Sequence, residues 1–142
     1  MTPAFWDSSA LVPICVRPQA SPHVHRLLKQ YEVVVWWATS VEIRSGLERL
    51  LRLKELSPSE HAGAGKRLEY LRSVWTEILP EIALRTDAEN LLSRFPLRAA
   101  DALHLAAAMT WAMGRPQGRA FISGDTALLG AAQSLGFQSI EA

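Results

Sequence analysis

Cysteine is nearly absent from this sequence, whose 142 residues contain only one, Cys15. An internal disulfide is therefore excluded, which is typical of proteins that fold in a reducing compartment. Cys15 lies in the apolar run 11–16, where a free cysteine usually packs as a small hydrophobic side chain. We interpret it as a buried residue and not as a nucleophile.

Long hydrophobic runs are missing as well, so no segment is predicted to span a membrane. The N-terminus has no basic region followed by an apolar stretch, which argues against a secretory signal peptide. We therefore expect a cytoplasmic protein.

Charge of either sign is not in excess, because 15 basic residues face 14 acidic ones and the net charge is +1. Composition alone therefore does not predict nucleic-acid binding. A local basic cluster exists at Arg44, Arg49, Arg52 and Lys54. This cluster fits a nucleic-acid contact and a solvated helix face equally well.

The pattern that is present predicts one α/β domain over residues 1–142. Strands alternate with helices, which predicts a three-layer fold with a small central parallel sheet flanked by helices. A Ser21 cap, a capping box from Ser57 to Glu60 and a stop at Gly136 mark helix ends. The strands are expected at 4–6, 33–37, 119–123 and 137–140, and the helices at 21–31, 40–56, 57–79, 86–94, 98–113 and 126–135.

Acidic residues follow three of the predicted strands. Asp7 comes directly after 4–6, and Asp125 follows 119–123 after one glycine. Glu42 lies in the first turn of the helix that follows 33–37. Because ligands of open parallel sheets bind outside the carboxyl ends of the strands, the three acids are expected at one edge. Each acid alone also fits a helix cap or a favourable charge at a helix N-terminus.

Asp101 is a fourth acid, and it lies in the otherwise apolar helix 98–113. Aspartate is seldom buried without a partner, and this helix is expected to begin at the same edge of the sheet. Four carboxylates at close range would raise one another's pKa values, and a divalent cation would remove that conflict. Mg²⁺ and Mn²⁺ prefer oxygen ligands and can activate water against a phosphodiester. A favourable interaction of Asp101 with the helix dipole is the competing interpretation.

Four motifs carry a resemblance to a known family: D-S-S-A-L at 7–11, S-V-E-I at 40–43, R-A-A-D-A-L-H-L-A at 98–106 and F-I-S-G-D at 121–125. In this order and spacing the sequence resembles PIN-domain proteins, and more narrowly VapC-type toxin ribonucleases. The resemblance covers essentially the whole chain. It implies a PIN-like fold, metal-dependent endonucleolytic cleavage of RNA, inhibition by a cognate VapB-like antitoxin, and a homodimer.

By residue, the resemblance assigns Asp7, Glu42, Asp101 and Asp125 as catalytic acids and as ligands of Mg²⁺ or Mn²⁺. The attacking water is expected to be activated by metal and carboxylate. Some relatives carry a further acid beside the last one, whereas Thr126 follows Asp125 here. The number of metal ions, one or two, therefore stays open.

Five neighbouring residues are weaker candidates. Ser8 and Ser123 are expected to orient an acid or a water by hydrogen bonding, with ordinary backbone-satisfying hydroxyls as the alternative. Arg44 and Arg98 are candidates for contact with RNA or an antitoxin, against simple surface charge. His104 lies on the same helix face as the helix acid. We interpret it as a satisfied buried histidine or a partner of an acid more readily than as a metal ligand.

Two other functions remain open. A non-catalytic PIN-like module that binds RNA or a protein would share the fold, although the complete acid set argues against it. A haloacid-dehalogenase-like phosphatase needs an acid at the position of Ser9, and a receiver domain needs a lysine at the end of a late strand, which 119–123 does not provide. A different phosphoryl-transfer protein of the α/β class is therefore disfavoured.

Overall fold

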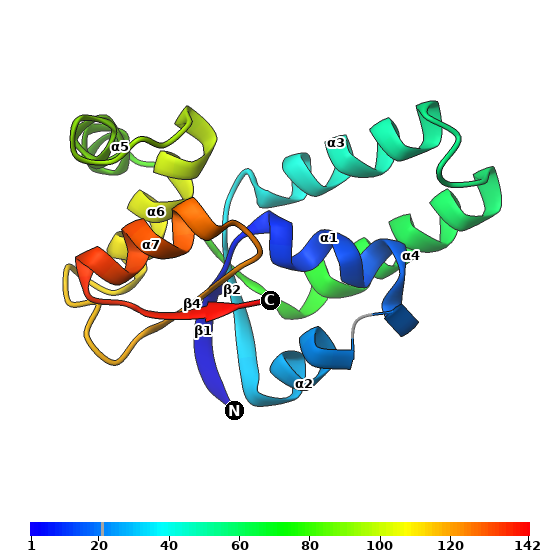
Figure 1. Cartoon of the computed structure of the whole chain (residues 1–142), viewed down its shortest axis with the longest axis horizontal. Helices are drawn as coiled ribbons and strands as arrows, with labels where there is room; N and C mark the ends of the chain where they lie inside the picture. The colour runs from blue at the N-terminus through cyan, green and yellow to red at the C-terminus, as the bar shows by residue number, and fades with distance from the viewer. Residues whose placement is uncertain (21) are drawn as a thin grey trace.

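A central parallel sheet organises the chain. The computed structural model describes residues 1–20 and 22–142, and in them five strands pair in the order β3-β2-β1-β4-β5 (Figure 1). Every neighbouring pair is parallel, so the carboxyl ends of the strands meet at one edge, here called the carboxyl edge. The strands are β1 (Thr2–Trp6), β2 (Tyr31–Trp36), β3 (Thr76–Ile78), β4 (Ala120–Ser123) and β5 (Gln138–Glu141).

Helices cover both faces of the sheet. One layer consists of α1 to α4 and the other of α5 to α7, which lie on either side of the strands in Figure 1. Within the described ranges, none of the helices is long and apolar enough to cross a membrane. The predicted three-layer α/β architecture is confirmed. The helices are α1 (Ser8–Val16), α2 (Pro22–Gln30), α3 (Thr39–Arg52), α4 (Pro58–Val74), α5 (Ile82–Arg94), α6 (Ala99–Trp111) and α7 (Thr126–Leu135), with a short 3-10 helix at Pro18–Ala20.

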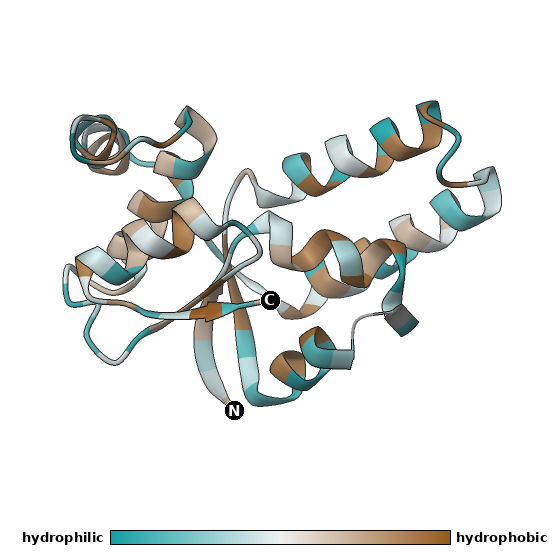
Figure 2. Cartoon of the chain, in the orientation of Figure 1, coloured by the Kyte–Doolittle hydropathy of each residue, from teal (hydrophilic) through white to brown (hydrophobic). Residues whose placement is uncertain are grey.

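Successive side chains of a strand point to opposite faces of the sheet, so apolar strands present a hydrophobic surface on both faces, and helices bury both. In β1, Phe5 packs into the core under α5–α7, whereas Ala4 and Trp6 pack into the core under α1–α4. In β4, Phe121 and Ile122 divide between the two cores in the same way. All five side chains are buried, which is the near-continuous apolar pattern of a parallel sheet. Figure 2 shows hydrophobic (brown) segments in the strands at the centre of the molecule, and brown segments mixed with teal ones along the long helices α3 and α4.

Two elements differ from the expectation. The helix expected over 57–79 ends at Val74, and Thr76–Ile78 forms the edge strand β3 instead. This short segment is a strand because it pairs with β2, a contact distant in sequence that local periodicity cannot reveal. The apolar run 11–16 belongs to α1, although we did not predict a helix there. Pro13 lies inside this helix, where proline normally argues against helical structure.

Two of the three predicted helix ends are confirmed. Ser57 Oγ accepts the Glu60 N–H at 3.1 Å, and Glu60 Oε1 accepts the Ser57 N–H at 2.9 Å, which forms the capping box of α4. Gly136 ends α7 with a φ of 112°, a left-handed conformation that glycine adopts without steric cost. The expected cap Ser21 lies outside the described residues.

The packing predicts how two leucines differ in their contribution to stability. Leu105 of α6 is fully buried, whereas Leu92 of α5 is 42% exposed. Leu105→Ala is expected to lower the free energy of unfolding by about 2–5 kcal/mol, because it leaves a cavity in the core. Leu92→Ala is the matched control and should change it by less than about 0.5 kcal/mol. Urea denaturation measures both, and equal losses would contradict this view of the core.

Candidate active site

Asp7 lies at the end of β1, on the carboxyl edge. Its backbone N–H donates to the Ile122 carbonyl oxygen at 2.9 Å, which extends the pairing of β1 with β4 by one residue. The residue is 3% exposed. Asp7 occupies the N-cap position of α1, yet in the described part of the chain its carboxylate makes no capping hydrogen bond. Helix capping therefore does not explain this acid.

Two serine hydroxyls fix one oxygen of the Asp7 carboxylate. Asp7 Oδ2 accepts hydrogen bonds from Ser9 Oγ at 2.5 Å and from Ser123 Oγ at 2.9 Å. Ser9 Oγ accepts the Gly124 N–H, and Ser123 Oγ accepts the Asp125 N–H, each at 2.9 Å. A hydroxyl has one proton and two lone pairs, so each serine accepts a backbone N–H and donates its own proton to Asp7 Oδ2. The backbone after β4 therefore holds Asp7 Oδ2 in place through two side chains.

Glu42 reaches the same edge from the first turn of α3. Its Oε1 accepts a hydrogen bond from Ser8 Oγ at 3.2 Å, and its Oε2 lies 2.7 Å from His104 Nε2. Both Ser8 Oγ and His104 Nε2 are also 3.5 Å from Asp7 Oδ1. Burial acts to lower the pKa of His104, but its hydrogen bond with Glu42 and the nearby carboxylate charges outweigh this effect and raise it. Ser8 and His104 thus connect Glu42 with Asp7.

Asp101 lies half-buried in the first turn of α6 and experiences the charges of other acids. Burial raises the pKa of its carboxyl group, and the charges of Asp125 and Asp7 raise it further. His104 and a backbone hydrogen bond at Arg98 act in the opposite direction without reversing the shift. Acids from the end of β1, the start of α6 and the start of α7 therefore influence one another across the carboxyl edge.

Asp125 is a helix cap as well as a member of this group. Its Oδ1 accepts the Leu128 N–H at 3.1 Å at the start of α7, so the capping interpretation is correct for this residue. Oδ2 takes no part in that bond. Burial, and then the charge of Asp125, raise the pKa of Asp101, so the Asp125 carboxylate acts on a neighbouring acid as well as capping α7.

The carboxyl edge has the donor chemistry of a magnesium or manganese site without forming a finished cage. In residues 1–20 and 22–142, no three His, Cys, Asp or Glu side chains are grouped closely enough to enclose a metal ion. Mg²⁺, however, usually keeps several waters and binds through only one or two carboxylates. Asp7 and Asp101 both lie at the carboxyl edge and are the candidates for these one or two carboxylates. Their oxygens are the type of ligand that Mg²⁺ and Mn²⁺ prefer.

The two candidate arginines lie in different surroundings. Arg44 of α3 has its guanidinium 4.0 Å from Glu48 and 3.9 Å from Glu69, so it faces α4 and two carboxylates. Arg98 is exposed at the N-cap position of α6, directly before the turn that carries Asp101. Arg98 is therefore the one that adjoins the acids.

Two residues of this network were missed or undervalued from the sequence. Ser9 was not singled out, although it donates to Asp7 and accepts the Gly124 N–H. Its signal was the second serine of D-S-S, but only the position of the β4 end decides which serine donates to Asp7 Oδ2 and which to Oδ1. His104 was an open alternative, and its partner Glu42 lies on a helix distant in sequence. By contrast, Cys15 is buried, and burial raises the pKa of its thiol to about 11, which agrees with a structural residue.

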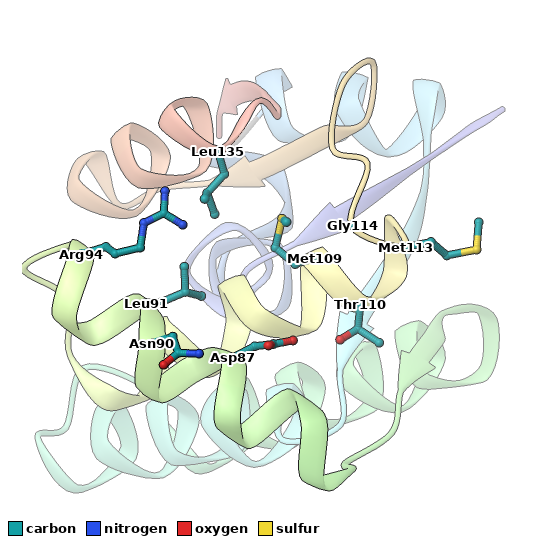
Figure 3. A pocket seen from close by; sticks show the side chains of 9 residues that line it. All are labelled: Asp87, Asn90, Leu91, Arg94, Met109, Thr110, Met113, Gly114 and Leu135. Atoms are coloured by element: carbon teal, nitrogen blue, oxygen red, sulfur yellow. The ribbon is translucent and has the colours of Figure 1, made fainter.

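A cavity of about 410 Å³ lies away from these acids. It is lined by residues of α5, the C-terminal end of α6 and the end of α7, among them Arg94, Thr110 and Leu135 (Figure 3). None of the four acids lines it. Thr110 and Asp101 are separated along α6 by about 13 Å at 1.5 Å per residue. The acids therefore belong to an open sheet edge, and this cavity is a separate feature.

The parallel sheet with order β3-β2-β1-β4-β5 and its two helical layers define a PIN-like α/β fold. Two solved structures resemble the chain over nearly its full length. PAE2754 from Pyrobaculum aerophilum has a TM-score of 0.68 and 18% identity, with 99% of this chain and 89% of that chain covered. FitAB bound to an IR36 DNA fragment has a TM-score of 0.67 and 16% identity, with 97% and 94% covered. No family model and no curated protein matches the sequence. The resemblance to PIN-domain proteins is thus confirmed as a likeness of fold.

The raised pKa of Asp101 predicts a stability effect. The folded protein holds this proton more tightly than the unfolded chain, whose carboxyl has the ordinary value of 3.8. Stability from this group therefore falls as pH rises from 3.8 through the raised pKa, and the ionised group destabilises the fold at pH 7. In chelator at pH 7, Asp101→Asn should raise the melting temperature.

Asp87→Asn, at an exposed acid of α5, is the matched control and should leave the melting temperature unchanged. Calorimetric scans of the three proteins measure the effect. A melting temperature of Asp101→Asn that equals or falls below that of the wild type would show that the acids do not repel one another as described.

Proposed function

We propose that this chain is a metal-dependent endoribonuclease that hydrolyses RNA phosphodiesters at the carboxyl edge. The observation that carries the proposal is the placement of the acids in a PIN-like fold: Asp7 follows β1, Asp125 follows β4, and Asp101 lies in the first turn of α6. Burial, and then the charges of Asp125 and Asp7, raise the pKa of Asp101, which agrees with this placement. Acids kept in such positions reduce stability, which is typical of functional sites. The proposed catalytic and metal-ligating residues are Asp7, Glu42, Asp101 and Asp125.

The metal ion is proposed to be Mg²⁺ or Mn²⁺, which when bound would supply a water of lowered pKa and stabilise the charged transition state. The role of the protein is to hold the carboxylate oxygens that would bind this metal ion. Two serine hydroxyls occupy Asp7 Oδ2 and leave Oδ1 toward the site, and the cap of α7 leaves Asp125 Oδ2 available. A carboxylate has about four lone-pair sites, so Glu42 keeps acceptor capacity beside its two hydrogen bonds. One metal ion is the simplest arrangement for this set.

The biological role that we propose is the toxin of a VapBC-type toxin–antitoxin pair. Support comes from the four motifs and from the fold shared with FitAB, whose structure was solved on a DNA fragment. The partners would be RNA, a VapB-like antitoxin and a second copy of the chain in a cytoplasmic homodimer. Arg98 is the better candidate for contact with RNA or antitoxin, because Arg44 already faces two carboxylates.

A non-catalytic PIN-like module that binds RNA or a protein is the second candidate function. The observation that favours it is that the described residues group no three potential ligands into a metal cage. Titration calorimetry with Mn²⁺ separates the two candidates. Saturable binding that Asp101→Asn abolishes favours the nuclease, whereas no detectable heat at millimolar Mn²⁺ favours the module.

The nuclease proposal predicts cleavage of bacterial RNA that requires both metal and Asp101. The purified chain, free of bound partners, is incubated with total RNA and Mn²⁺, Mg²⁺ or a chelator, and new 5′ ends are mapped. Wild type should produce discrete new ends only with metal. Asp101→Asn should lower the rate by about 10²–10³-fold or more, the loss found when one preorganised group that stabilises a transition state is removed.

Asp87→Asn is again the matched control, because it removes an exposed aspartate of α5 and should cleave at the wild-type rate. Cleavage that persists in chelator, or that Asp101→Asn performs as fast as wild type, would contradict the proposal. Mapping the ends also identifies the target, since the bases that flank each cut define the preferred sequence or RNA shape.

A further inference from the structure

We propose that His104 is a positioning residue of the carboxyl edge, which rests on the proposed function. Its Nε2–H holds Glu42 beside Asp7, so that the acids keep the arrangement that a divalent cation binds. In this role His104 acts through Glu42 and does not itself contact the metal ion.

The hydrogen bond between His104 and Glu42 connects two helices on opposite faces of the sheet. Glu42 belongs to α3 and His104 to α6, and these helices cover opposite faces of the sheet. The 2.7 Å contact between His104 Nε2 and Glu42 Oε2 therefore joins the two helical layers at the carboxyl edge. Asp101 lies one turn before His104 on α6, so the same bond sets the position of Glu42 relative to Asp101.

The His104 ring is fully buried, and only one of its two nitrogens has a polar partner. His104 is 0% exposed and meets the Phe5 ring edge-on, with centroids 6.5 Å apart. Its Nδ1 is buried and has no hydrogen-bond partner among the described residues. Within the described residues, Nε2 is the one nitrogen of this imidazole with polar partners, and it faces Glu42 and Asp7. Burial of a polar ring is costly unless it is hydrogen-bonded, and the contacts of Nε2 with the two acids offset this cost.

The unpartnered Nδ1 also distinguishes a role in which His104 holds Glu42 from one in which His104 itself binds the metal ion. For Nε2 to bind a metal ion, its proton would have to leave, and a neutral ring would then carry its proton on Nδ1. A buried N–H without an acceptor costs about 1–3 kcal/mol, so that tautomer is disfavoured here. The neutral ring with its proton on Nε2 donates to Glu42 and leaves no buried N–H without an acceptor.

The test is the affinity of the full chain for Mn²⁺, measured by titration calorimetry without RNA. His104→Met keeps a side chain of similar length but removes the donor, whereas His104→Gln keeps an N–H near the position of Nε2. Loss of a hydrogen bond to a ligating carboxylate typically weakens metal binding by about 10–100-fold, which is expected for the Met variant. The Gln variant keeps one donor, so it should lose less than the roughly 10–100-fold of the Met variant and bind close to wild type.

Leu105→Met is the matched control, because it places the same new side chain at the adjacent buried position of α6. It should leave the Mn²⁺ affinity unchanged, and thermal melting in chelator checks that every variant folds. Met and Gln variants that lose affinity equally, or a Met variant that binds as wild type does, would overturn the positioning role while the proposed function stands. Wild type without Mn²⁺ binding would overturn the proposed function, and this inference with it.

A second measurement needs no substitution at His104. Imidazole ¹⁵N NMR of the full chain reports whether Nε2 carries a proton, and Mg²⁺ is added as a diamagnetic probe. The Nε2 proton is expected to remain when Mg²⁺ binds. Its loss on binding would show direct ligation by His104 and would overturn the positioning role even if the Met variant did not fold.

Discussion

The hydrogen bonds that Asp7 Oδ2 receives from Ser9 and Ser123 are the constraint on which the rest of the carboxyl edge depends. They form only because β1 pairs with β4, which brings the end of one strand beside the end of the other. Backbone N–H groups after β4 donate to both serine oxygens, and both hydroxyls donate to Asp7 Oδ2. The other oxygen, Oδ1, faces Ser8 and His104. One carboxylate is thus fixed by the sheet itself, and the remaining acids are arranged around it.

The other acids come from opposite sides of the sheet, and this arrangement works against stability. Glu42 is carried by one helical layer and Asp101 by the other, while Asp125 begins α7. Burial and like charge raise the pKa of Asp101, and His104 offsets only part of this effect. A fold selected for stability alone would remove such charges, whereas a site that binds a cation and a phosphodiester needs them. Local structure also explains part of the set, because Asp125 caps its helix.

Sequence patterns predicted the layered α/β architecture and the edge at which the acids would gather, because both follow from local features. Apolar runs define buried strands, and a residue directly after a parallel strand has only one edge to occupy. Strand β3 and helix α1 were missed, since the first depends on pairing with β2 and the second contains Pro13. The bond between His104 and Glu42 was equally out of reach, because it joins two helices 62 positions apart in sequence.

The central claim is that the carboxyl edge binds a divalent cation through acids held by the fold. Anomalous diffraction from a crystal of the chain grown with Mn²⁺ tests it most directly, because the signal locates the metal ion without reference to activity. The account predicts a peak at this edge, about 2 Å from oxygens of Asp7 and Asp101. A saturating concentration of Mn²⁺ that gives no peak there, or a peak only elsewhere on the molecule, would contradict it.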